Sequence, residues 1–253
     1  MRDLFPPHGL PVDPERLLPL LRRAIDGKYG GLIARVTEVS GSSDALNVAI
    51  QIFDINGIKV GDATRTYYHN NGQLIANHAN LFLQRHVRGQ GFATEFNNEM
   101  FGWYRESHVD HVLLRANIDV GSYAWALQGF DFRFRAEAVS NIKPRLAREV
   151  NAMLREAHQL YAELKSIPDG PERSEGVKRY EQLLATINEG RGILARFHEG
   201  STDFPTAREI AQLGRPADAL PGQSKDLSWP GKRVFMESKV PIWWQAIKRL
   251  DEE

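Results

Sequence analysis

The feature that most constrains this chain is a short loop with two glycines, Arg88 to Ala93, whose sequence is RGQGFA. A β-like run, Leu74 to Leu83, comes before it. Phe96, Met100, Trp103 and Tyr104, which recur at three- and four-residue intervals after it, predict a helix from Ala93 to Ser107. A loop that opens a helix directs backbone N–H groups and the helix dipole toward anions, and glycine lets a phosphate oxygen approach closely. With the fixed charge of Arg88, the loop predicts a phosphate or pyrophosphate site.

Two well-known phosphate-binding loops differ from this one in their spacing. A nucleoside-triphosphate loop has Lys and then Ser or Thr after its second glycine, whereas Phe92 and Ala93 follow Gly91. The Rossmann fingerprint has a third Gly or Ala where this chain has Thr94, and its acidic residue ends the next strand, whereas Asp110 precedes that strand. The sequence therefore supports neither of them. An ordinary strand-to-helix turn is the remaining alternative.

Four β-like runs precede the loop and are joined by turn-forming residues. Asn56-Gly57 is the strongest short hairpin pattern in the chain, and Asn70 to Gly72 predicts another tight turn. The four runs extend over Leu32 to Val39, Leu46 to Ile55, Ile58 to His69 and Leu74 to Leu83. They predict an antiparallel meander, and Asp13-Pro14 predicts a helix that comes before it.

After the loop helix come a strand, His111 to Ile118, a short helix, Gly121 to Leu127, and a strand that begins with Gly129-Phe130 and ends at Arg135. This order, together with Arg88-x-x-Gly91-x-Ala93, resembles the GNAT superfamily of acyl-CoA N-acyltransferases over residues 30 to 135. The resemblance implies an α/β (α+β) fold with a mixed, mainly antiparallel sheet and splayed central strands.

The resemblance also implies the donor and the residues that hold it. The donor is acetyl-CoA or another acyl-CoA, with no metal, and its thioester lies where the fourth and fifth strands splay apart. Backbone groups at Phe82 and Leu83 pair with the pantetheine arm, which Asn117 and Ser122 face from the other side. The loop that binds the diphosphate consists of Arg88, Gly89, Gln90, Gly91, Phe92, Ala93 and Thr94.

The proton donor for the leaving thiolate departs from the family pattern. The family commonly has a tyrosine four residues before the Gly-Phe pair, and this chain has Trp125 there. Tyr123 is the candidate acid, although it projects on a different side of a regular helix. A packing tyrosine with a satisfied hydroxyl, a reaction without a side-chain acid, and loss of activity are the alternatives.

The candidate base is His78, on the fourth strand near the splay, because its intrinsic pKa suits proton transfer at neutral pH. A cross-strand packing histidine is the alternative. Asn80 and His69 are further polar positions near the cleft. His86 precedes Arg88 and is either a phosphate contact or a solvent-exposed loop residue.

The rest of the chain is mainly helical. Two amphipathic stretches, Arg145 to Lys165 and Gly176 to Phe197, predict a helical hairpin. A loop from Gly200 to Gly231 and a last strand, Lys232 to Glu237, are expected to follow. The predicted domains are a core at 1–135, a helical insertion at 136–231, and the final strand and closing segment at 232–253. The insertion is expected either to cover the sheet, to form a homodimer contact, or to wall the acceptor cleft.

Composition excludes several other classes of protein. The chain lacks cysteine, so thiol nucleophiles and cysteine-ligated zinc are excluded. It has no Gly-x-Ser-x-Gly elbow, and His108 to His111 has no distant cluster to complete a metal site. Its 32 basic and 32 acidic residues give zero net charge, which disfavours a nucleic-acid partner. No membrane-length apolar run or signal peptide is present, so a cytoplasmic protein is expected.

These features together predict an N-acyltransferase. It moves an acetyl or other acyl group from acyl-CoA to an amine of a small molecule or peptide, by direct attack in a ternary complex. The alternative is a catalytically inactive acyl-CoA-binding protein that acts through a partner contact on the helical hairpin.

Overall fold

The computed structural model describes residues 14–42, 44–116, 121–216, 229–236 and 244–250. Its described residues contain eight strands and eight α-helices, and none of these helices is long and apolar enough to cross a membrane. The chain divides into two compact units. The first comprises Met1–Arg115 with Ile247–Glu253, and the second comprises Ala116–Ala246. The segment that follows β6 (His111–Ala116) groups with the helices of the second unit, and the predicted domains 1–135, 136–231 and 232–253 stay a prediction.

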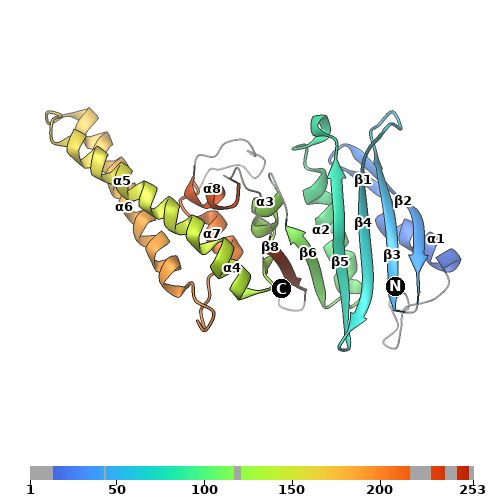
Figure 1. The fold of residues 1–253 in the computed structure, drawn as a ribbon. Helices are drawn as coiled ribbons and strands as arrows, with labels where there is room; N and C mark the ends of the chain where they lie inside the picture. Colours follow the sequence, from blue (N-terminus) through green and yellow to red (C-terminus); the bar gives the residue numbers. More distant parts are fainter. Residues whose placement is uncertain (1–13, 43, 117–120, 217–228, 237–243, 251–253) are drawn as a thin grey trace. The chain divides into compact units, whose positions relative to one another are not determined.

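The first unit is built on a mainly antiparallel sheet (Figure 1). Five strands form an antiparallel meander, in which the turns at Gly57 and at Asn71-Gly72 have positive φ angles. Their bounds are β1 (Gly27–Tyr29), β2 (Leu32–Gly41), β3 (Ala45–Phe53), β4 (Lys59–Asn70) and β5 (Gln73–Leu83). Next to β5 in the sheet lies β6, and next to β6 lies β8 (Trp244–Arg249). The predicted meander is confirmed, and the short strand β1 was missed.

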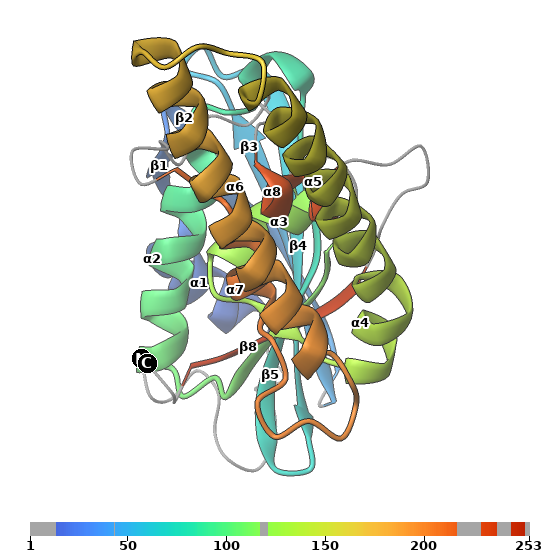
Figure 2. The ribbon, with the colours of Figure 1, turned by 90° about the vertical axis from the view of Figure 1, so that its left-hand side faces the viewer.

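Two helices of this unit, α1 (Pro14–Ile25) and α2 (Phe92–Glu106), lie behind the strands in Figure 1 and on one side of them in Figure 2. The helix α1 buries Leu17, Leu21 and Ile25 at four-residue spacing and packs against β2. The helix α2 buries its apolar face as well, from Phe92 to Tyr104. The predicted helices are therefore confirmed, and the core of the unit lies between them and the sheet.

Strand β5 pairs with β4 along its whole length but has a second partner along only its first half. It pairs in parallel with β6 only from Ile75 opposite His111 to His78 opposite Leu114. The register with β4 shifts at the same place, because Thr64 faces Asn80 while Arg65 faces His78, which leaves a bulge at Ala79. From Ala79 to Leu83, the edge of β5 away from β4 has no strand partner among the described residues.

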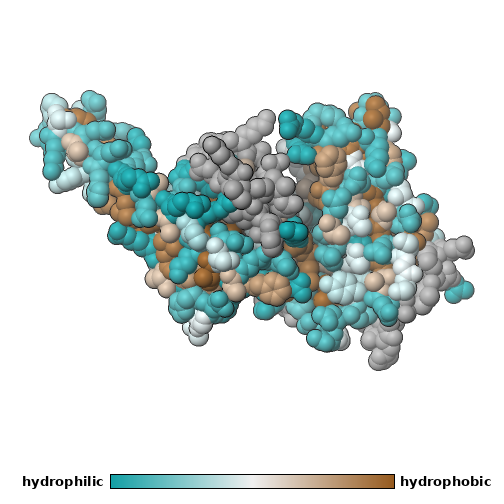
Figure 3. All heavy atoms as spheres, viewed as in Figure 1, coloured by the Kyte–Doolittle hydropathy of each residue, from teal (hydrophilic) through white to brown (hydrophobic). Residues whose placement is uncertain are grey.

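The second unit is mainly helical, and its β7 (Asp131–Phe132) lies beside β8. Arg133 donates its N–H to the carbonyl oxygen of Gln245 at 2.9 Å there. Its helices are α3 (Gly121–Leu127), α4 (Arg135–Asn141), α5 (Lys143–Leu164), α6 (Pro171–Arg196), α7 (Ala207–Gln212) and α8 (Pro230–Met236). The predicted hairpin of α5 and α6 is confirmed. On the face seen in Figure 3, hydrophilic side chains cover most of the end of the hairpin at which α5 and α6 are joined.

Three predictions for this unit were wrong. The stretch after Lys232 is the helix α8, because packing against α7 overrides its strand-like composition: a Cβ on Gly231 would lie 2.7 Å from the Ala211 carbonyl oxygen. The loop predicted from Gly200 includes the buried helix α7. The strand predicted to end at Arg135 covers only two residues, and α4 begins at its expected end.

Candidate functional site

The predicted phosphate loop joins a single 3-10 turn, Arg85–Val87, to the first residue of α2. Gly89 and Gly91 have φ angles of 79° and 91°, a left-handed conformation that side chains with a Cβ rarely adopt. Gly91 is the N-cap of α2, which begins at Phe92, one residue before the predicted start. A Cβ on Gly89 would meet no atom within 4 Å, so the space above this glycine is open. The loop therefore has the backbone shape that a close-approaching anion requires.

The loop offers a row of backbone donors. The N–H groups of Gly89, Gln90, Gly91, Phe92 and Ala93 make no hydrogen bond to any described residue. Their position explains this, since the first N–H groups of a helix have no partner within it. The N–H of Thr94, also a predicted donor, already donates to the carbonyl oxygen of Gly91 at 3.0 Å.

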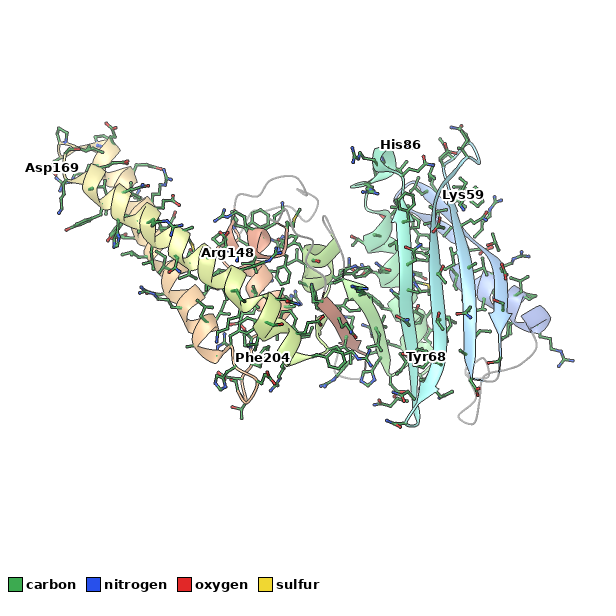
Figure 4. All side chains as sticks on the ribbon, viewed as in Figure 1. Lys59, Tyr68, His86, Arg148, Asp169 and Phe204 are labelled. Atoms are coloured by element: carbon green, nitrogen blue, oxygen red, sulfur yellow. The ribbon has the colours of Figure 1, made fainter. Side chains whose placement is uncertain are left out.

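Arginine and histidine side chains gather on the same segment. Arg88 donates from Nε to the carbonyl oxygen of Leu83 at 2.8 Å, and its guanidinium carbon lies 5.6 Å from the centre of the Phe82 ring. Arg85 and His86 are exposed on the 3-10 turn. Figure 4 shows His86 at the end of the sheet where Lys59 lies. Arg88 therefore ties the end of β5 to the loop and holds a positive charge between them.

The turn between β1 and β2 packs against this loop, a contact that sequence reasoning missed. A Cβ on Gly30 would lie 2.7 Å from Phe92 Cα and 2.8 Å from the Gln90 carbonyl oxygen. The Gly30 N–H also donates to a carboxylate oxygen of Glu95 at 2.6 Å. The Gly30-Gly31 pair is the pattern in the sequence that marks this close approach. This contact holds the loop in place and makes the N–H of Phe92 the most enclosed of the loop's backbone donors. It also brings the carboxylate of Glu95 beside the loop.

His78, the candidate base, is buried between β5 and α2 with 5% of its surface exposed. Its Nε2 lies 3.0 Å from the Tyr104 hydroxyl, and its ring stacks on Phe101. Burial lowers the pKa of His78 well below its ordinary value, and the nearby Arg65 lowers it further. His78 is therefore neutral at pH 7, as a base must be, while its surroundings are those of a packing residue.

Tyr123, the candidate acid, belongs to the second unit. It is buried, and its ring lies 5.9 Å from that of Trp229. Burial raises the pKa of Tyr123, while Arg215 and Trp229 oppose that rise. Ser122 beside it is buried as well, and Asn117 lies outside the described residues. Trp125 packs against Phe130 with ring centres 5.1 Å apart.

The other polar positions have structural contacts. Asp110 accepts the Leu74 N–H through its carboxylate at 2.6 Å and the Leu250 N–H through its carbonyl oxygen at 3.2 Å. The side-chain amide of Asn80 donates to Asp62 at 2.9 Å. No three His, Asp or Glu side chains gather as metal ligands in the part of the chain that the structure describes.

Comparison with known proteins adds little to this geometry. No protein-family model matches the chain, and no curated protein matches it. Among solved structures, an acetyltransferase from Bacillus cereus is similar over 29% of this chain and 49% of its own, with 20% identity and a TM-score of 0.25. The match thus spans about half of that acetyltransferase. At this TM-score the likeness assigns neither a fold nor an activity to the chain.

Proposed function

We propose that this protein is an acyl-CoA-dependent N-acyltransferase with a GNAT-like first unit, acting on an amine of a small molecule or peptide. The observation that supports this most is the continuity of two features. The unpartnered edge of β5 leads from Ala79 to Leu83, and directly after it Gly89 to Ala93 present free N–H groups at the start of α2. An unpartnered strand edge suits the extended polar arm of coenzyme A, because it can pair with the amides of that arm. A loop with free N–H groups at the start of a helix suits the diphosphate.

The residues of the loop fit the diphosphate by charge and by shape. Left-handed Gly89 and Gly91 keep Cβ atoms away from the phosphate oxygens, and Arg88 supplies a charge that is already anchored on Leu83. Phe82, about half exposed beside Arg88, offers an apolar surface next to the arm. In this proposal the free edge of β5 pairs with the amides of the arm, so that the thioester comes to lie near the bulge at Ala79.

The proposed reaction is a direct transfer. The acceptor nitrogen attacks the thioester carbon, a C–N bond forms, the C–S bond breaks, and the nitrogen loses a proton while the thiolate gains one. We propose His78, which the lowered pKa keeps neutral, as the base of this transfer within the first unit. Tyr123 belongs to the second unit and stays the candidate acid by its residue type.

The alternative function is acyl-CoA binding without transfer, with α5 and α6 as the contact for a partner or a second copy. Two observations favour it. Both candidate catalytic side chains are buried, and Trp125 occupies the position of the family's tyrosine.

Replacing Gly91 by Glu tests the acyl-CoA site. The new carboxylate would stand against the diphosphate, and we expect acetyl-CoA affinity in isothermal titration to fall at least ~100-fold. Gly72→Glu is the matched control, because Gly72 also has a positive φ but lies in the turn between β4 and β5, and a Cβ there would meet no atom within 4 Å, whereas one on Gly91 would lie 3.6 Å from Glu95 Oε1. Unchanged affinity in the Gly91 variant would show that the loop does not bind the donor.

Turnover separates the two functions. Wild-type protein is incubated with acetyl-CoA and a panel of amines and peptides, and release of free thiol is followed. Turnover on any acceptor supports the transferase, whereas binding without turnover on the whole panel supports the inactive binding protein. A wild-type protein that binds neither CoA nor any acyl-CoA would overturn both.

A further inference from the structure

A buried arginine without a carboxylate partner among the described residues lies in the core of the first unit. Arg65, on β4, has 0% of its surface exposed. Its Nη1 donates to the carbonyl oxygens of Thr64 at 3.0 Å and Asn80 at 2.8 Å, and the neutral Tyr104 hydroxyl is a further hydrogen-bonding neighbour of the guanidinium. Buried guanidinium groups are ordinarily paired with a carboxylate, because water no longer solvates their charge.

The groups that face Arg65 do not balance its charge. They are Tyr67 on the same strand, His78 on β5 and Tyr104 on α2, with the Phe96 ring centre 5.7 Å from the guanidinium carbon. Burial raises the pKa of both tyrosines, so their hydroxyls stay protonated at neutral pH. Arginine stays charged in proteins even where burial lowers its pKa, as it does here. No described anionic side chain pairs with Arg65.

The position of this charge relates it to the proposed donor site. The bond to Asn80 holds the guanidinium next to the bulge at Ala79, where β6 stops pairing with β5. The free edge of β5 spans about 13 Å from Leu83 to Ala79. One end of that edge meets the diphosphate loop, so the acyl end of the donor belongs at the other, beside Arg65.

We propose that Arg65 receives a carboxylate carried by the acyl group, so that the preferred donor is the CoA thioester of a short dicarboxylic acid. This assignment rests on the proposed acyl-CoA site. Nε and Nη2, which no described carboxylate meets, form one edge of the guanidinium, and such an edge suits both oxygens of a planar carboxylate in parallel. An acetyl group offers no such partner and leaves the charge unpaired.

The test compares two donors that differ only in this group. Succinyl-CoA carries a carboxylate where butyryl-CoA carries a methyl group on a chain of equal length, and unacylated CoA gives the baseline. We expect wild-type protein to bind succinyl-CoA at least about tenfold more tightly than butyryl-CoA in isothermal titration. We expect Arg65→Met to lose that preference while keeping its affinity for CoA, and Arg65→Lys to keep part of it.

The matched control is Arg35→Met, since Arg35 is exposed on β2 and its loss should leave the preference unchanged. The wild-type comparison needs no variant, so it stands even if Arg65→Met fails to fold. Equal affinity for the two acyl-CoAs, or tighter binding of butyryl-CoA, would overturn the assignment while leaving the acyl-CoA site in place. Failure of wild-type protein to bind CoA itself would overturn the acyl-CoA site, and the role of Arg65 with it.

Discussion

The two ends of the free β5 edge differ in the groups that can bind an anion and in how exposed those groups are. At the glycine loop, Arg88 to Ala93, the donors are backbone N–H groups and the surroundings are exposed. At the bulge, the donor is the side chain of Arg65, enclosed by Tyr67, His78 and Tyr104. An exposed loop loses little free energy while it is empty, because water solvates its amides. A buried cation destabilises the folded chain until an anion pairs with it. In the proposed site, the loop therefore contributes to the affinity for CoA, and Arg65 at the bulge contributes to the preference for one acyl group over another.

Gly30 tests how far the loop depends on its neighbours, and its replacement carries the largest expected effect. Gly30→Ala forces a Cβ into the backbone of Phe92 at a φ of 51°, so we expect the free energy of unfolding to fall by about 3 kcal/mol. Gly31→Ala is the control, because Gly31 has a φ of 81° and no atom near its Cβ position, and we expect a loss of only about 1 kcal/mol. Urea unfolding measures both. Equal losses would mean that the turn does not support the loop.

The pH dependence of the free energy of unfolding tests the burial of His78, at the bulge end of the β5 edge. His78 has a lowered pKa in the folded protein, so the unfolded chain binds more protons as the pH falls below about 6.5. We expect the free energy of unfolding to drop with falling pH there, by up to about 1.4 kcal/mol per pH unit from this one group, and to be unaffected by it above pH 7. His78→Gln keeps a hydrogen-bonding group near Tyr104 and should flatten that slope. An unchanged slope would show that His78 is not buried as a neutral ring.

Sequence patterns predicted the position and conformation of the loop because both depend on the local backbone. Glycine spacing, the strand before it and the helix after it are local features, and the left-handed Gly89 and Gly91 follow from them. The meander and the helical hairpin followed from the same kind of local periodicity. The contact of Gly30 with the loop joins segments about sixty residues apart, so no local pattern contains it.

The bulge could not be predicted in this way. The pattern of β4 places Arg65 between buried positions, but only the register shift beside Ala79 and the packing of α2 show what encloses it. His78 and Tyr123 were chosen by residue type and position, which carry no information on burial. The helix α8 shows the same limit, since contact with α7 decided its structure against local propensity.

Glu95 carries the smallest expected effect and separates two roles within the loop. Its carboxylate accepts the Gly30 N–H, and it also places a negative charge one turn into α2, beside the proposed diphosphate. Glu95→Gln keeps an oxygen that can accept the hydrogen bond and removes the charge. We expect acetyl-CoA to bind about two- to fivefold more tightly at low salt, since one repulsive pair is lost. The free energy of unfolding should fall by about 0.5 kcal/mol, because a helix N-terminus favours negative charge.

Glu99→Gln is the control for this change, since Glu99 is exposed one turn further along α2 and should alter affinity less. Titration with acetyl-CoA at low and at high salt measures both variants, and screening should erase the gain from Glu95→Gln. Weaker binding in that variant would contradict the electrostatic account. It would mean that the charged hydrogen bond to Gly30 holds the loop in shape, and that shape outweighs charge even at the exposed end of the β5 edge.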